Sequence, residues 1–130
     1  MSEPISKPEL DRMKDPYTEL IGFVPPRVDA RLRVSGDIDP EYLRLQEAMR
    51  RHCMYPPCFD IKITQLMLFG MLLMTMGDGA KFHAIAARRA GATWEELHAT
   101  AAMAGLFRGL PAMNLAAAML DELRRSELPA

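Results

Sequence analysis

Apolar side chains recur every three or four residues through the middle of the chain, which is the period of an α-helix. The first such run contains Tyr42, Leu45, Ala48 and Met49. Asp39 stands before it as an N-cap, and Pro40 suits the first helical position because that residue needs no N–H partner. We therefore predict a helix from Asp39 to about Arg51, ended by the turn Tyr55-Pro56-Pro57.

The next run is apolar on almost every side of the helix that it predicts, from Asp60 to Thr75. A helix that is apolar all round lies at the centre of a bundle or across a subunit interface. The uncharged stretch between Lys62 and Asp78 holds about fifteen residues, which is shorter than the ~20 residues that span a bilayer. We interpret this stretch as a buried core helix.

Three more helices follow from their end signals. After Gly77-Asp78-Gly79 a helix runs to Ala90, where Gly91 supplies the stop. Thr93 and Glu96 form a capping box for a helix to about residue 106, and Pro111 opens a last helix to about residue 125. No alternating run of β-branched residues predicts a strand. The fold class is therefore all-α, a bundle of about five or six helices.

Residues 1–35 carry five of the ten prolines and no sustained apolar period. Proline fixes φ and removes a backbone donor, so this stretch is not one long helix. We predict an arm with a short helix over residues 1–35, wrapping the domain or a neighbouring subunit. A helical domain follows over residues 36–130.

The charge balance gives no electrostatic preference for nucleic acid or an anionic membrane, because 16 basic and 17 acidic residues leave a net charge of -1. The polar start of the chain has no apolar leader. Cys53 and Cys58 are too few for a disulfide scaffold. We expect a reduced, cytoplasmic protein without nucleic-acid or membrane partners.

His83 is the leading catalytic candidate, because an imidazole gains or loses a proton near neutral pH. Its helical neighbours three and four residues away are all small: Gly79, Ala80, Ala86 and Ala87. We predict that the ring projects from a face with room for a substrate. The alternative is a histidine packed inside the bundle for structural reasons.

A series of landmarks runs through residues 59–120. In order they are His83, Gly91-Ala92-Thr93, Glu95-Glu96, Gly109-Leu110-Pro111 and Asn114. Their joint spacing resembles the carboxymuconolactone decarboxylase and alkylhydroperoxidase D-like family. The resemblance implies the alkylhydroperoxidase D-like helical fold, a small-molecule substrate and a homo-oligomer, a trimer or hexamer, formed through helical faces.

In the peroxidase branch of that family, a Cys-x-x-Cys pair occupies the seventh and fourth positions before the histidine. Met76 and Gly79 stand at those positions, and a proton-relaying glutamate of that branch falls on Thr64. None of the three supplies a thiolate or carboxylate, so dithiol peroxide reduction is excluded at that place. The chain is therefore closer to the branch without the cysteine pair, which keeps the histidine.

The resemblance implies a cofactor-free lyase acting on a small cyclic carboxylated or ketonic metabolite, with His83 as general acid or base. The substrate-binding candidates are Thr64, Met76, Lys81, Met103, Phe107 and Arg108. Arg108 or Lys81 would hold a carboxylate, although Lys81 can also pair with Asp78 three residues earlier. Met76 and Met103 replace polar family positions, which predicts a more hydrophobic substrate.

Two other functions stay open. Cys53 and Cys58, five residues apart, can act as a displaced redox pair of a thiol peroxidase. The chain can also be a non-catalytic small-molecule binding or assembly protein that keeps the fold without the chemistry. No cofactor or metal is expected, because His52, His98 and the two cysteines lack the spacing of a zinc site.

Overall fold

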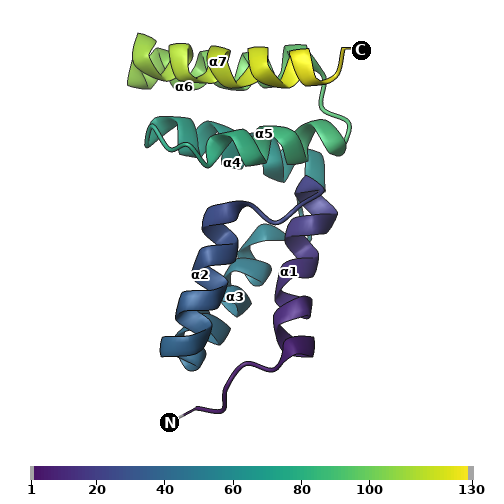
Figure 1. The fold of residues 1–130 in the computed structure, drawn as a ribbon. Coiled ribbons are helices and arrows are strands. Elements are labelled where there is room, and N and C mark those ends of the chain that lie inside the picture. Colours follow the sequence, from purple (N-terminus) through teal and green to yellow (C-terminus); the bar gives the residue numbers. More distant parts are fainter. Residues whose placement is uncertain (1, 129–130) are drawn as a thin grey trace. The chain divides into compact units, whose positions relative to one another are not determined.

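The computed structural model describes residues 2–128, which fold into seven α-helices without a strand (Figure 1). In chain order they are α1 (Lys7–Ile21), α2 (Pro26–Ile38), α3 (Pro40–Met54), α4 (Ile61–Met74), α5 (Ala80–Arg89), α6 (Trp94–Arg108) and α7 (Leu110–Ser126). The all-α class is confirmed. The predicted number of five or six helices is corrected to seven within the described residues.

The N-terminal stretch, where the sequence predicts an arm with one short helix, forms the two helices α1 and α2. Pro8 lies in the first turn of α1 and Pro26 opens α2, where a missing N–H breaks no helical hydrogen bond. Ser6 caps α1 by accepting a hydrogen bond from the backbone N–H of Glu9 at 3.2 Å. These two prolines therefore mark helix starts.

Pro16 lies inside α1, where proline leaves the carbonyl four residues earlier without its helical donor. That carbonyl belongs to Arg12, and it accepts a hydrogen bond from Nη2 of Arg51 at 3.4 Å. A side chain of α3 thus compensates for the break in α1.

The chain divides into two compact units, one ending at Pro57 and the other beginning at Cys58. The predicted boundary after residue 35 falls inside α2. In the first unit, ion pairs tie both outer helices to α3. Arg44 binds Glu9 of α1 at 2.8 Å, and Arg31 of α2 binds Glu47 at 2.7 Å.

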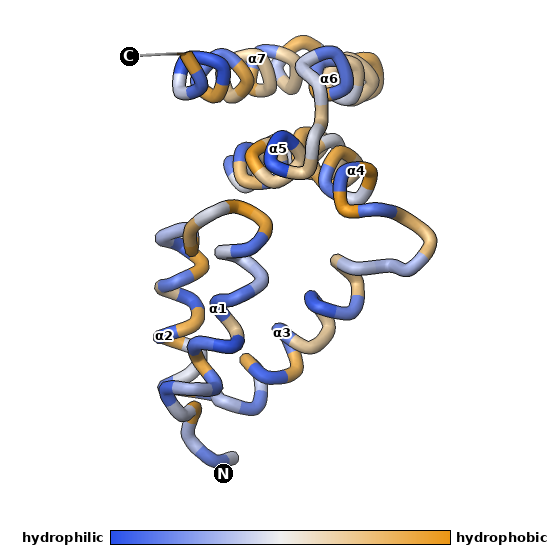
Figure 2. Tube along the Cα trace, turned by 90° about the vertical axis from the view of Figure 1, so that its right-hand side faces the viewer, coloured by the Kyte–Doolittle hydropathy of each residue, from blue (hydrophilic) through white to orange (hydrophobic). Residues whose placement is uncertain are grey.

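The second unit consists of two helical layers. Figures 1 and 2 both show α4 beside α5 and α6 beside α7. Its core contains Phe69, Leu73 and Leu97, each with no exposed surface. The rest of this core consists largely of alanines: Ala80, Ala84, Ala87, Ala92, Ala101, Ala104 and Ala116. Such small side chains allow the helices to approach closely.

Three predicted helix starts are confirmed by their caps. Asp39 accepts from the backbone N–H of Tyr42 at 3.1 Å, and Asp60 accepts from that of Ile63 at 2.7 Å. Thr93 and Glu96 form both hydrogen bonds of a capping box, at 3.0 and 3.1 Å.

α4 is not buried on all sides within a single chain. Phe69 and Leu73 are fully buried, whereas Met71 and Met74 are 59% and 39% exposed. Within residues 2–128, no helix combines the length and the apolar character that crossing a bilayer requires.

Candidate functional site

His83 lies in α5, and Gln65 approaches it from α4. The Nδ1 atom of the imidazole is 2.7 Å from Oε1 of the Gln65 amide. Gln65 is only 1% exposed, while His83 is half-buried. The contact therefore joins a fully buried amide to a ring that retains some access to solvent.

An amide oxygen only accepts hydrogen bonds, so Nδ1 carries the hydrogen in this arrangement. In the neutral ring, Nε2 then holds the lone pair and is the atom that takes up a proton. With the amide oxygen toward the ring, Gln65 orients His83 and favours the tautomer with the hydrogen on Nδ1. An acceptor behind a histidine has this effect in known proton-transfer sites.

Gln65 is one of three polar or charged residues, with Lys62 and Thr64, in the N-terminal part of the largely apolar α4, and sequence reasoning does not identify it. A buried amide without a hydrogen-bond partner costs about 1–3 kcal/mol, and the imidazole of His83 supplies such a partner. In the sequence, Gln65 is only a polar residue next to an apolar run. Its near-complete burial, which marks it as important, is visible only in the structure.

Three of the four small neighbours of His83 are packed inside the second unit. Ala80, Ala86 and Ala87 are at most 1% exposed, so other side chains cover them. Their size allows α5 to pack closely against α4. That the small neighbours also leave room for a substrate beside the half-buried ring stays a prediction.

Thr64 precedes Gln65 and is 5% exposed. Its hydroxyl donates to the backbone carbonyl of Asp60 at 2.9 Å, so it is already engaged within its own helix. Its assignment to substrate binding stays a prediction.

Lys81 pairs with Glu122 of α7, with Nζ 2.6 Å from Oε1. Asp78 lies in the turn that leads into α5, where its carbonyl accepts from the backbone N–H of Lys81 at 3.3 Å, but the ion pair of Lys81 is formed with Glu122 instead of with Asp78. Lys81 and His83 are two residues apart and therefore about 200° apart around α5. The lysine does not share the helical face of the imidazole.

The other four substrate-binding candidates lie at helix ends. Met103, Phe107 and Arg108 are exposed in the C-terminal half of α6, with Phe107 83% exposed. Met76 follows α4, is half-buried and has a φ of 56°. Their roles in substrate binding stay predictions.

Cys53 and Cys58 are both exposed and unbonded. Within residues 2–128, no group of three or more His, Cys, Asp or Glu side chains is arranged to hold a metal ion. Neither His52 nor His98 therefore belongs to such a group.

These features define an all-helical protein whose candidate site is an imidazole oriented by a buried amide. The sequence matches the model of the carboxymuconolactone decarboxylase family over residues 40–122, from the start of α3 into α7. The chain belongs to the carboxymuconolactone decarboxylase family, as the spacing of its landmarks predicts. No significant match was found among curated proteins or solved structures.

Proposed function

We propose that the protein is a cofactor-free lyase resembling the carboxymuconolactone decarboxylases and that it acts on a small cyclic carboxylated or ketonic metabolite. His83 is the general acid or base. The observation that carries the proposal is the 2.7 Å contact between Nδ1 of His83 and Oε1 of Gln65. It directs the proton-transfer capacity of the ring to Nε2. Membership of the family supports a function of this superfamily.

In the proposed reaction, the bond between the ring carbon and the carboxylate breaks and carbon dioxide leaves. The electron pair stays on the substrate as an enolate. Protonated His83 donates the Nε2 proton to the enolate, which completes the product. Nδ1–H remains bonded to Gln65 before and after the transfer, so the ring is not reoriented. Solvent returns the proton to Nε2.

Arg108 is the better candidate of the two cations for holding the substrate carboxylate. Lys81 is engaged by Glu122 at 2.6 Å, whereas Arg108 makes no ion pair within the described residues. The planar guanidinium matches a carboxylate bidentately. A substrate more hydrophobic than a dicarboxylate lactone follows from the proposed lining by Met76 and Met103.

The test is carbon dioxide release from a panel of cyclic β-keto acids and carboxylated unsaturated lactones. The wild type is compared with His83→Ala and with the double variant Cys53→Ser/Cys58→Ser. We expect His83→Ala to lose about 100-fold or more of the rate and the double serine variant to keep it. Activity that survives His83→Ala contradicts the proposal. Peroxide reduction that is lost with both cysteines would indicate the thiol peroxidase, and ligand-induced thermal stabilisation without turnover would indicate a binding protein.

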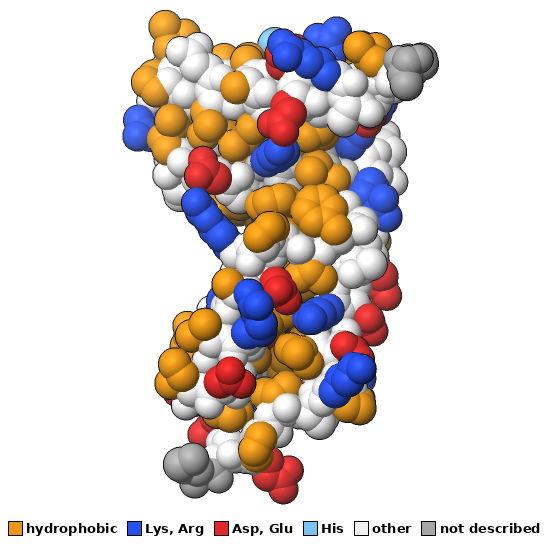
Figure 3. All heavy atoms as spheres, viewed as in Figure 1, with side chains coloured by type: hydrophobic (Ala, Val, Ile, Leu, Met, Phe, Trp, Pro, Cys, Tyr) orange, Lys and Arg blue, Asp and Glu red, His pale blue; other side chains and the backbone are white. Residues whose placement is uncertain are grey.

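We further propose that the protein works as a homo-oligomer, a trimer or hexamer. Large apolar side chains are exposed where α6 meets α7, and Figure 3 shows hydrophobic atoms gathered at that end of the second unit. They are Met103 at 61%, Leu106 at 76%, Phe107 at 83% and Leu110 at 75% exposure. A monomer rarely leaves such a patch open to water. A second copy of the chain is the proposed cover.

A further inference from the structure

A separate cavity of about 440 Å³ lies between α1 and α3, wholly within the first unit. Its charged lining consists of four arginines and two glutamates: Arg12, Arg44, Arg50, Arg51, Glu9 and Glu47. Positive charge is therefore in excess by two. The excess is local, because the whole chain has a net charge of -1.

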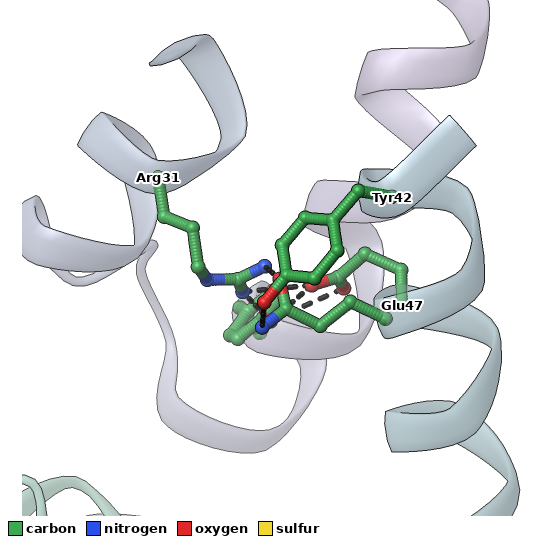
Figure 4. Close-up of polar contacts among 5 residues, drawn as sticks. Arg31, Tyr42 and Glu47 are labelled. Carbon is green, nitrogen blue, oxygen red and sulfur yellow. Dashed lines mark hydrogen bonds and ion pairs between the residues drawn. The ribbon is translucent and has the colours of Figure 1, made fainter. Parts of the chain in front are cut away.

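Glu47 is neutralised by groups behind the cavity wall. The hydroxyl of Tyr17 donates to both carboxylate oxygens, at 3.0 and 3.1 Å, and Nη2 of Arg31 lies 2.7 Å from Oε1 (Figure 4). Arg31 also donates to the Tyr17 hydroxyl at 2.8 Å. Burial raises the pKa of Tyr17, so its hydroxyl stays protonated and available as a donor.

Glu9 is neutralised in the same way by Arg44. Two hydrogen bonds, at 2.8 and 2.9 Å, join the guanidinium to both carboxylate oxygens. The Arg44 hydrogen bond lowers the pKa of Glu9, so the pair stays ionised and its charges cancel. Because Glu9 is balanced by Arg44, and Glu47 by Arg31 from outside the lining, the three arginines Arg12, Arg50 and Arg51 carry the remaining positive charge of the cavity.

Two of these three guanidinium groups are held in place by contacts that leave donors unused. The guanidinium of Arg50 stacks on the ring of Tyr17, 4.0 Å from its centroid, and this uses its face and not its N–H edge. Arg51 donates one hydrogen bond, to the carbonyl of Arg12. Arg12 and Arg51 also line a neighbouring pocket with Asp15 and Glu19. The ion pairs of the first unit among the described residues join its carboxylates to Lys14, Arg31, Arg33 and Arg44, and not to Arg12, Arg50 or Arg51.

The remaining lining is apolar and comes from Met13, Pro16 and Ala48. The cavity thus offers an apolar wall beside several guanidinium edges. A planar fork of N–H donors matches the oxygens of a carboxylate or a phosphate. We propose that this cavity binds a small organic anion, with a carboxylate or phosphate held by Arg12, Arg50 and Arg51 and an apolar body against the wall.

The site is built from residues 9–51 and shares none with the Gln65–His83 pair. An experiment can therefore reject the anion-binding proposal without rejecting the lyase proposal, and the reverse. Binding of an anion that persists in His83→Ala, with unchanged affinity, is the expected result.

The experiment is calorimetric titration of the purified full-length protein with phthalate and, separately, with inorganic phosphate. We expect saturable binding, weakened about fivefold or more by Arg12→Gln or Arg51→Gln. The matched control is Arg33→Gln, an exposed arginine of α2 that does not line the cavity. It should stay within about twofold of the wild type. Tighter binding of phthalate assigns the site to carboxylates with a flat body, and tighter binding of phosphate assigns it to phosphate esters.

Arg51→Gln also removes the hydrogen bond to the Arg12 carbonyl and is checked by circular dichroism. Arg12→Gln leaves that main-chain contact intact, so it tests the site even if the other variant unfolds. The absence of saturable binding of both anions up to about 10 mM overturns the proposal. An equal loss in Arg33→Gln overturns it too, because diffuse attraction then explains the binding.

Discussion

The side chain of Gln65 favours one of the two tautomers of His83. The amide is fully buried and its oxygen lies 2.7 Å from Nδ1, so the ring keeps its hydrogen there. One side chain therefore determines both the position and the chemistry of another.

Replacing Gln65 by Leu removes this acceptor while keeping a similar volume. We expect the free energy of unfolding to fall by about 1–3 kcal/mol, because the Nδ1–H of His83 loses its buried partner. The ¹⁵N shifts of the His83 ring should move toward the other tautomer. Urea unfolding and nitrogen NMR measure the two effects. The control is Gln46→Leu, which removes an amide that accepts a hydrogen bond from Arg31 in the first unit and should leave the His83 shifts unchanged. Unchanged His83 shifts in Gln65→Leu would contradict the role assigned to Gln65.

The sequence indicates His83 as a candidate, whereas it does not indicate Gln65. A histidine amid the landmarks of a known family suggests proton transfer. The resemblance points instead to Thr64, one position away from the true partner. One residue turns a helix by about 100°, so Thr64 bonds its own helix while Gln65 faces His83. Only the register between α4 and α5 distinguishes the two.

Among the helices, α4 depends on a close approach at Gly70. A Cβ at this position would lie 3.0 Å from Cγ2 of Thr100 in α6. The Thr100 hydroxyl donates to the carbonyl of Glu96 at 2.9 Å, which holds its side chain in place. The two helices are therefore as close as a glycine permits.

Gly70→Ala should destabilise the protein by about 1–3 kcal/mol through this overlap. The control is Gly79→Ala, where the nearest atom to the new Cβ lies at 3.7 Å and φ is -61°. That change should be neutral or stabilise by up to about 1 kcal/mol, since alanine restricts the unfolded chain. Urea unfolding compares the two, and equal stabilities would contradict the packing of α4 against α6.

The start of α6 should lose stability in acid. The hydrogen bond from the backbone N–H of Thr93, followed by that from Lys62, lowers the pKa of Glu96 from its ordinary 4.5. A lowered folded-state pKa stabilises the protein above the unfolded value and loses that effect as pH falls through the folded value. The urea midpoint of wild type should exceed that of Glu96→Gln at pH 7, and the difference should shrink as the pH falls below the ordinary pKa of 4.5 and vanish below the lowered folded pKa. A difference between wild type and Glu96→Gln that does not change with pH would contradict the role of the ionised Glu96.

The caps of α3, α4 and α6 are readable from sequence because each uses a side chain within three residues of its backbone donor. The helices α1 and α2 are not readable from sequence, because their prolines suggest breaks in the chain. At Pro16, the freed carbonyl of Arg12 accepts a hydrogen bond from Arg51, which is distant in sequence. A tertiary contact here overrides a local signal.

At the scale of the whole molecule, the exposed apolar end where α6 meets α7 predicts self-association. Phe107→Glu should place a charge in the proposed interface and reduce the assembly to the 14.6 kDa chain. Val34→Glu, an equally drastic change at an exposed site on α2, should leave the assembly intact. Sedimentation velocity distinguishes the two, and a monomeric wild type would contradict the proposed oligomer.

We propose that His83, oriented by Gln65, transfers a proton to the substrate. The most direct measurement is deuterium incorporation from D₂O during decarboxylation of the cyclic acids, followed by proton NMR. We predict one deuterium for each carbon dioxide released by the wild type and a rate reduced about 100-fold or more in His83→Ala, with Cys53→Ser/Cys58→Ser unchanged. Incorporation at the wild-type rate in His83→Ala would contradict the account.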